Sequence, residues 1–343
     1  MDRSVVVSLC VLFSLFFGGC SPKPKEEALS LSTSNVLVAV DTLIYPVAGA
    51  VSCSIVNDSI LVAAHKQRAD SAIFTVYNIR TNKLVREILY GQDEDRCLGI
   101  IYAASAEGVL LHDFVKERFA LITPERLGDN SELSFHKTNI HAQCILAAKQ
   151  NRLLFLNPDS FENRKRRVLF SDKECNYMQR NTPSVDTYNV VDGFLLSNKD
   201  ASRFFYIDKH SGRIELYDDR LSQIKVWDVP DAPTPDYTIY KSGKHKICAF
   251  KGSIPFTFIA GSVDKSGIAL VYDPCYLSVD KGFVYGDTPA YLMMFSWEGN
   301  VKTISLINAG QHPDQCHVLS EGKVSLLFCE EHVIKEVVYE CAS

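Results

Sequence analysis

No long stretch of this 343-residue chain places apolar residues at the spacing of an amphipathic helix. The sequence also lacks a Gly-x-Ser-x-Gly nucleophile elbow, a phosphate-binding loop and a His-Glu-x-x-His zinc motif. It contains no Cys-x-x-Cys pair, the close spacing that zinc sites use. The net charge is −5, and the one basic run, residues 164–167, is interpreted as a solvated turn. These absences argue against a helical fold, against the motif-bearing enzyme classes and against a nucleic-acid partner.

What the sequence has instead is a series of short strands joined by tight turns. The pattern is clearest between Arg203 and Asp228, where apolar and polar residues alternate with a period near two. The expected strands are Phe204–Ile207, Ile214–Tyr217 and Ile224–Trp227. Gly, Asp and Ser occupy the reversals between them. Such a meander cannot bury both of its faces alone, so several copies must pack together.

Units of this kind recur along the chain at roughly 40 to 50 residues each, the period of a β-propeller blade. Six units fit, the fifth with an insertion from Pro274 to Pro289 and the sixth one strand short. The lone strand at 36–40 can supply the missing strand by pairing with Val333–Tyr339. The sequence therefore predicts an all-β, six-bladed β-propeller closed by pairing of the N- and C-terminal strands. A β-sandwich with long hairpins is the alternative.

The N-terminus predicts export and lipidation. Arg3 precedes the apolar run Val5–Phe17, which is too short to span a bilayer and ends in Gly18-Gly19-Cys20. This ending resembles a bacterial lipobox, in which the cysteine receives the lipid; the alternative is an ordinary secretory signal that contains a cysteine. The expected organisation is a lipoprotein signal peptide at 1–19, a flexible tether at 20–34 and the propeller at 35–343. Ser21 follows the cysteine, which by the same resemblance favours an outer-membrane lipoprotein, facing the periplasm or the cell surface.

Two short segments carry a resemblance to a known family. Residues Tyr291–Asn300, YLMMFSWEGN, are similar to a strand–Gly–Asn hairpin of the TolB-like six-bladed propeller lipoproteins of Bacteroides-type bacteria. Tyr90–Asp95 resembles a Gly-x-Gly-Pro-x-Glu turn of the same family, without the second Gly and the Pro. The resemblance implies the propeller fold and a lipid-anchored location in the envelope. It implies no catalytic residues.

Propellers bind ligands where the loops entering their innermost strands converge, so the polar residues of these loops are the candidate site. The candidate ligand-binding residues are Arg96, His141, Gln143, Asp186, His312, Asp314 and Gln315. Such a set suits a sugar, a peptide or a cation, although each residue alone is more simply an exposed turn residue. No catalytic residue, metal ligand or cofactor is predicted.

Four cysteines recur near the start of an expected innermost strand: Cys53, Cys97, Cys144 and Cys316. Cysteine packs well where strands crowd together, so packing is favoured over a metal or thiolate cluster. Without Cys10 of the signal peptide and the lipidated Cys20, nine cysteines remain, an odd number that leaves at least one thiol unpaired. Cys329 and Cys341 are close enough in the last unit to pair.

The function predicted from these features is that of a lipid-anchored, non-enzymatic binding or scaffold protein. Its expected partners are the membrane, through the lipid on Cys20, and a polar small molecule, glycan or partner protein at the channel mouth. The alternative is a metal-assisted hydrolase or lyase that acts on a glycan-derived substrate. The fold alone does not choose between the two classes.

Overall fold

The computed structural model is all-β: apart from one 3-10 turn at Pro124–Arg126, the regular elements of its described residues are strands. The structure describes residues 24–31, 35–56, 58–68, 71–105, 108–127, 132–140, 145–148, 152–156, 168–176, 185–186, 193–242, 245–278, 280–308, 310–319 and 323–340. No helix within these ranges is long and apolar enough to cross a membrane. The predicted signal peptide and Cys20 lie outside them.

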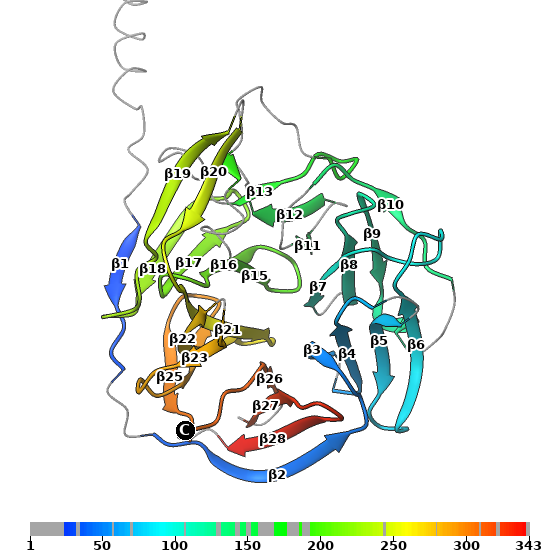
Figure 1. Ribbon diagram of the computed structural model, residues 1–343. Helices are drawn as coiled ribbons and strands as arrows, with labels where there is room; N and C mark the ends of the chain where they lie inside the picture. The colour runs from blue at the N-terminus through cyan, green and yellow to red at the C-terminus, as the bar shows by residue number, and fades with distance from the viewer. Residues whose placement is uncertain are drawn as a thin grey trace, which may run out of the picture.

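The strands form sheets that are arranged around a common centre like the blades of a propeller (Figure 1). In most of these sheets the strands are antiparallel and follow one another in sequence order, the meander that the sequence predicts. The first sheet contains β3 (Ala50–Val56), β4 (Ile60–His65), β5 (Ala72–Asn78) and β6 (Lys83–Leu89). The second contains β7 (Ile100–Ser105), β8 (Gly108–Asp113), β9 (Arg118–Ile122) and β10 (His136–Lys137). In each, the first strand lies nearest the centre.

The later sheets repeat this arrangement with additions. One sheet contains β11 (Ile145–Ala148), β12 (Arg152–Leu156) and β13 (Val168–Phe170). The next contains β15 (Gly193–Ser197), β16 (Arg203–Asp208), β17 (Arg213–Asp218) and β18 (Gln223–Asp228), the segment with the clearest strand pattern. It is followed by β21 (Ile254–Val263), β22 (Gly267–Ser278), β24 (Tyr291–Ser296) and β25 (Val301–Leu306). The last contains β26 (Gln315–Val318), β27 (Lys323–Cys329) and β28 (Ile334–Glu340).

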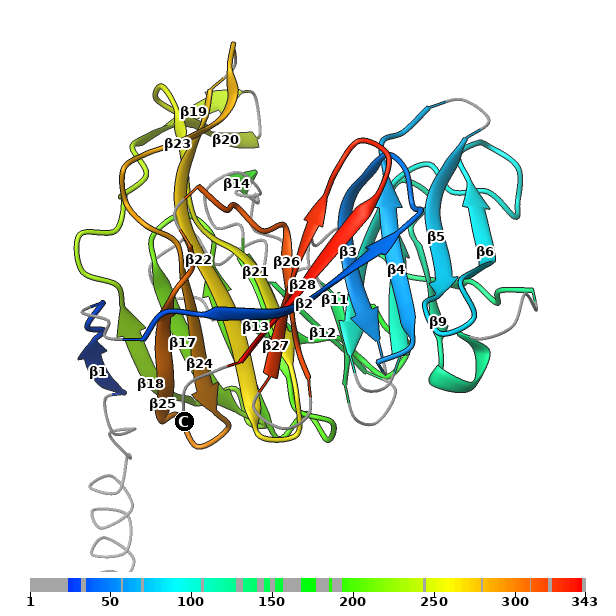
Figure 2. The same ribbon diagram turned by 90° about the horizontal axis from the view of Figure 1, so that it is seen from below.

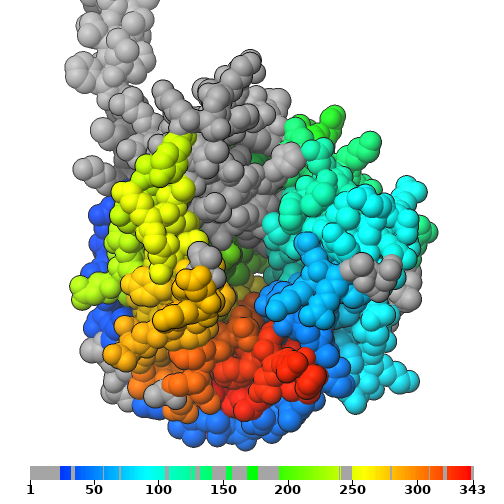
Figure 3. All heavy atoms as spheres, in the orientation of Figure 1, coloured from blue at the N-terminus to red at the C-terminus, as the bar shows by residue number. Residues whose placement is uncertain are grey.

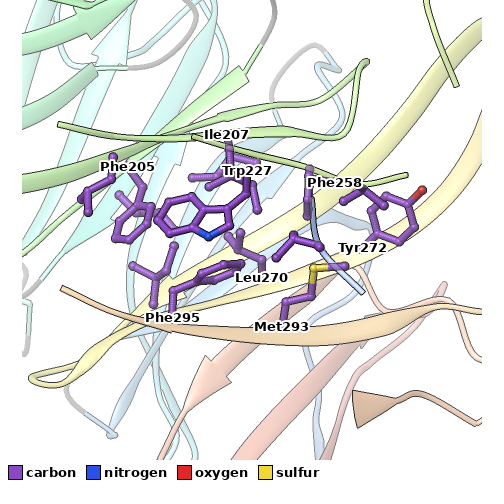
Figure 4. Close-up of a cluster of buried hydrophobic side chains, with 14 of the residues drawn as sticks. Phe205, Ile207, Trp227, Phe258, Leu270, Tyr272, Met293 and Phe295 are labelled. Atoms are coloured by element: carbon purple, nitrogen blue, oxygen red, sulfur yellow. The ribbon is translucent and has the colours of Figure 1, made fainter. Parts of the chain in front are cut away.

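Apolar side chains from neighbouring sheets fill the space between them. Strand β16 is buried at five successive positions because other sheets cover both of its faces. The core between the β15–β18 sheet and the β21–β25 sheet is rich in aromatic rings (Figure 4). There the ring of Trp227, which is fully buried, lies 5.2 Å from that of Phe295 in an edge-to-face contact.

Strand β2 (Val38–Tyr45), from the N-terminal part of the chain, lies in one sheet with the last strand, β28. The two strands pair in antiparallel register, from Val38 opposite Glu340 to Tyr45 opposite Ile334. The strand begins two residues later than expected and continues five residues further. Figure 2 shows it crossing the edge of the last sheet before the chain enters β3.

The expectation of a free tether through residue 34 is not met over its central part. Residues Lys25–Ala28 form strand β1, which pairs in parallel with β18. Lys225 forms an ion pair with Glu27 at 2.7 Å, and Leu29 is buried in the aromatic core. Edge pairing of this kind uses backbone hydrogen bonds, so a polar composition does not prevent it.

A further small sheet departs from the simple repeat. It consists of β14 (Val185–Asp186), β20 (His245–Phe250) and β19 (Tyr237–Ser242), with β14 parallel to β20. The expected insertion after Pro274 is also ordered: β22 continues through Ser278 and pairs with β23 (Gly282–Tyr285). Both additions stand above the same face of the molecule, at the top of Figure 2.

Candidate functional site

The candidate site lies on the face where the first strand of each sheet begins, here called the entry face. Because the strands are antiparallel, the end of each second strand lies at this face too: His65 at the end of β4 pairs with Ala50 at the start of β3. Figure 3 views the molecule from this side and shows a hollow near its centre. The β19–β20 hairpin and the β22–β23 extension border the hollow on one side.

A histidine–aspartate pair lies beside β22 on this face. Nδ1 of His312, a predicted ligand-binding residue, is 3.0 Å from Oδ2 of Asp273, which the sequence analysis did not single out. The side chain of Asp273 is only 2% exposed, whereas that of His312 is 34% exposed. The ring of Tyr285, from β23, stacks on the imidazole with 3.6 Å between the ring centroids. Strands β22 and β23 of one sheet therefore both hold His312 in place.

The charge on Asp273 determines which nitrogen of His312 carries the proton. Burial raises the pKa of Asp273, and its hydrogen bond to His312 opposes that shift. An ionised Asp273 can only accept, so Nδ1 then carries the proton and Nε2 is left as the acceptor or metal-ligating atom. The second oxygen of Asp273, Oδ1, is buried and has no hydrogen-bond partner within the described chain. Such an arrangement can bind a ligand hydroxyl or amide, or accept a proton.

A separate line of polar contacts crosses the innermost strands. Nε2 of Gln315, another predicted site residue, donates to Oγ of Ser54 at 3.2 Å. That oxygen lies 3.4 Å from the hydroxyl of Tyr102. The three residues belong to β26, β3 and β7, which lie next to one another around the centre of the molecule (Figure 1). Burial raises the pKa of Tyr102, so this hydroxyl is a neutral hydrogen-bonding group.

Tyr102 also lines a cleft of about 390 Å³ between the first and second sheets. Ser52, His65, Lys66 and Gln67 contribute polar groups to the cleft, and isoleucines from β5 and β7 contribute apolar surface. Nε2 of His65 lies 2.9 Å from Oγ1 of Thr75, and burial lowers the pKa of this histidine. A concave surface with a few convergent polar groups is the usual form of a small-molecule site.

The other predicted site residues do not join this arrangement. The carboxylate of Asp314 accepts a hydrogen bond from the backbone N–H of Cys329 at 2.6 Å, a contact that fixes its loop to β27. Arg96 pairs with Asp93 at 3.1 Å within its own loop. Asp186 was expected just before an innermost strand, but it lies in β14 of the additional sheet, opposite Ile247. His141 and Gln143 lie outside the described residues.

The structure brings together two predicted residues, His312 and Gln315, with several that the sequence analysis missed. Asp273 carried a usable signal, because it is a carboxylate within a buried strand and such groups are rarely buried without a partner. His65 also carried one, because hairpin geometry places the end of a second strand beside the start of the first. Tyr285 carried none, since its contact with His312 depends on how the β22–β23 extension folds back.

The expected register of cysteines is only partly present. Cys53, Cys97 and Cys316 are all buried, as packing residues would be. However, Cys53 is the fourth residue of β3, Cys316 is the second residue of β26, and Cys97 precedes β7 by three residues. Cys144 lies outside the described residues. Among the described residues no group of three His, Cys, Asp or Glu side chains is placed to hold a metal ion.

No protein-family model and no curated protein matches the chain. Solved structures do resemble it. A member of the DUF4221 family from Bacteroides vulgatus ATCC 8482 is 11% identical, with a TM-score of 0.55, and the match covers 90% of this chain and 98% of that one. A candidate exported protein from Bacteroides fragilis NCTC 9343 is 8% identical, with a TM-score of 0.51, and the match covers 93% and 99% of the two chains.

At these identities the likeness concerns the fold alone. It supports a β-propeller and links the chain to Bacteroides proteins of similar architecture. Membership of the TolB-like family, which the two sequence segments suggest, stays a prediction.

Proposed function

We propose that this protein is a lipid-anchored, six-bladed β-propeller of the bacterial cell envelope that binds a polar ligand at its entry face without chemically converting it. The observation that carries the proposal is the line of polar contacts from Gln315 through Ser54 to Tyr102, which lines the cleft. This line connects three innermost strands to a concave surface, on the face that also carries the His312–Asp273 pair. A glycan, with many hydroxyl groups, fits this combination, and a partner protein is the other occupant of the same face.

Several observations support the proposed blade number and location. Six of the sheets begin with an innermost strand, namely β3, β7, β11, β15, β21 and β26, and β2 completes the sheet of β26–β28. The sequence Phe16–Cys20 supports lipidation at Cys20, and Ser21 supports an outer-membrane position. The description of the Bacteroides fragilis neighbour as a candidate for export agrees with an envelope location.

The second candidate function is a metal-assisted hydrolase or lyase that acts on a glycan-derived substrate. The observation in its favour is the same His312–Asp273 pair, because an aspartate that fixes one imidazole nitrogen is also the usual support of a metal-binding histidine. Both candidate functions use the same site residues. They differ in whether the ligand is released unchanged or as a product.

One set of variants tests the site and separates the two candidates. The set is His312→Ala, Asp273→Asn and Tyr102→Phe, with His332→Ala as the matched control, because His332 is 81% exposed in the β27–β28 turn. The probe is an array of bacterial and host glycans, followed by titration with the glycan retained. We expect the first three variants to weaken binding about tenfold, a loss of ~1.4 kcal/mol each. The control should bind like the unaltered protein.

If all four variants bind the glycan with the affinity of the unaltered protein, the binding site does not lie at these residues of the entry face. A glycan that is consumed, at a rate that falls after treatment with a chelator and returns with Ca²⁺ or Zn²⁺, would instead establish the enzymatic alternative. A glycan recovered unchanged after long incubation supports the binding function.

A further inference from the structure

Two cysteine sulfurs meet where the first and last sheets adjoin. Sγ of Cys329, at the end of β27, lies 3.6 Å from Sγ of Cys53 in β3. The two residues are 276 positions apart in the sequence, and both thiols are unbridged in the structure. The sequence analysis paired Cys329 with Cys341 instead, a residue that lies outside the described ones.

The surroundings hold these two sulfurs together. Both belong to an apolar cluster that draws Ile55 and Leu61 from the first sheet and Leu327 and Ile334 from the last. Cys53 is fully buried, whereas Cys329 is partly exposed and within reach of a reagent in solution. The buried Cys316 on neighbouring β26 differs, because its thiol points to the carbonyl oxygen of Ala269 at 3.6 Å.

We propose that Cys53 and Cys329 form a disulfide that joins β3 to β27 when the protein is in an oxidising compartment. A disulfide has an S–S distance of about 2.05 Å, so the sulfurs must approach by roughly 1.5 Å. A half-buried side chain at the end of a strand can supply such a movement by turning about its Cα–Cβ bond. The inference is independent of the proposed ligand, since neither cysteine belongs to the polar line or to the cleft.

The reaction needs a disulfide oxidant, such as oxidised glutathione or the active-site disulfide of a thiol oxidoreductase. The Cys329 thiolate attacks one oxidant sulfur and forms a mixed disulfide, and the first oxidant thiolate leaves. The Cys53 thiolate then attacks the Cys329 sulfur, and the second oxidant thiolate leaves. The protein loses two protons and two electrons, and the oxidant disulfide is reduced to two thiols.

The exposure of the two residues sets the order of these steps, with the accessible Cys329 reacting first. The contact with Cys329 and the burial of Cys53 together raise the pKa of the Cys53 thiol well above its ordinary value. Its attack in the second step is therefore the slow one, and the rate of closure should increase with pH.

The position of the bond gives it a mechanical role. The chain connects the last sheet to the first through β2, which pairs with β28 and then leads directly into β3. Side-chain contacts such as His317–Asp58 add to this junction. If β2 leaves β28, the propeller can open at this junction. A bond between β3 and β27 would hold the two sheets together even then, because it does not depend on the β2–β28 ladder.

The test begins with the full purified protein, equilibrated in oxidised and reduced glutathione. Unreacted thiols are then blocked with N-ethylmaleimide under denaturing conditions, and the digest is analysed by mass spectrometry. We expect a peptide pair that joins Cys53 to Cys329. Oxidation should raise the midpoint of thermal unfolding by about 5–10 °C, the scale expected of a cross-link that encloses so long a loop. Cys316→Ala is the matched control and should leave both results unchanged.

Cys329→Ser should abolish both the linked peptide and the shift in the unfolding midpoint, and its partly exposed position makes it the variant of choice. Cys53→Ser serves as the second variant. Finding both thiols fully blocked in the oxidised wild-type protein, or Cys329 joined to Cys341, would overturn the proposal. Either result would leave the proposed ligand site unaffected.

Discussion

His317 and Asp58 form a hydrogen bond between the last and the first sheet, with Nε2 of the imidazole 2.9 Å from Oδ1 of the carboxylate. His317 is a buried residue of β26, and Asp58 lies in the β3–β4 turn with a φ angle of 49°. The pair therefore lies at the opposite end of β3 from the entry face. It helps to hold together the junction between the first and the last sheet, which the Cys53–Cys329 contact also spans.

Removing this acceptor should destabilise the junction. In Asp58→Gly the backbone keeps its positive φ at no steric cost, so the variant isolates the loss of the carboxylate. We expect a loss of about 1–2 kcal/mol of unfolding free energy, because the imidazole of His317 stays buried without its partner. Urea unfolding measures the change, and a double-mutant cycle with His317→Gln measures the coupling. A coupling energy of zero would show that the contact contributes nothing.

The same pair predicts a pH dependence. The hydrogen bond to His317 lowers the pKa of Asp58 below its ordinary value of 3.8. A group with a lower pKa in the folded state contributes stability that is complete above its unfolded pKa and is lost as the pH falls through the folded value. As the pH is lowered from 6 to 3, the midpoint of urea unfolding should therefore fall less steeply in Asp58→Asn than in the wild type. The asparagine keeps a hydrogen-bond acceptor but cannot be protonated. Parallel profiles for the variant and the wild type would contradict this.

Strand β1 should contribute measurably to stability. Leu29, only 4% exposed, packs in the core that contains Trp227 and Phe205. Leu29→Ala should cost about 2–3 kcal/mol of the free energy that keeps β1 on β18. Amide hydrogen exchange of residues 25–29 measures this directly, since a detached strand exchanges quickly. Glu26→Ala is the control, because Glu26 is exposed on the same strand; unchanged exchange in Leu29→Ala would mean that β1 is held by its backbone alone.

Trp227 should be the most costly single truncation in the aromatic core. It is fully buried and its ring contacts those of Phe205 and Phe295. Trp227→Ala should lose about 3–5 kcal/mol through the cavity it leaves. Trp227→Phe should lose much less, because it keeps an aromatic ring and removes an indole N–H that is buried without a hydrogen-bond partner among the described residues. Denaturant unfolding of both variants decides the point, and equal losses would show that ring size matters more than the unpaired donor.

The lipid anchor is tested by Cys20→Ser. The variant should remain unprocessed or be released in soluble form, because serine cannot receive the thioether-linked lipid. Phase partition in Triton X-114 is the measurement, with the unaltered protein expected in the detergent phase. Retention of the variant in that phase would disprove lipidation at Cys20.

The sequence was most informative where strands are regular and covered on both faces. The expected strand Ile224–Trp227 lies within β18 (Gln223–Asp228), and the expected strand Ile214–Tyr217 lies within β17 (Arg213–Asp218). The pairing of the N-terminal strand with the last strand was also predictable, because a four-strand unit with one strand missing must recruit it from elsewhere. The positions of the strands, and the gap in the last unit, can both be read from the repeat of apolar runs and turns.

Other structure that depends on pairing between distant segments, with no gap in the repeat to signal it, was not predictable. The segment of β1 has the composition of a tether, and nothing in its side chains signals that its backbone adds to the edge of β18. Asp186 was placed before an innermost strand because it precedes the expected first strand of the fourth unit, whereas it pairs with β20, some 60 positions later. The His312–Asp273 pair likewise joins residues that are 39 positions apart.

The docking of β1 has a consequence for how the molecule stands on a membrane. Lys25, the first residue of β1, lies five positions after Cys20, and a fully extended chain over five positions reaches about 17 Å. Because β1 is parallel to β18, and β18 runs toward the entry face, β1 begins at the opposite face. A lipid on Cys20 would therefore hold that opposite face close to the bilayer. The entry face, with His312 and Tyr102, would then point away from the membrane and be accessible to ligands in the aqueous phase.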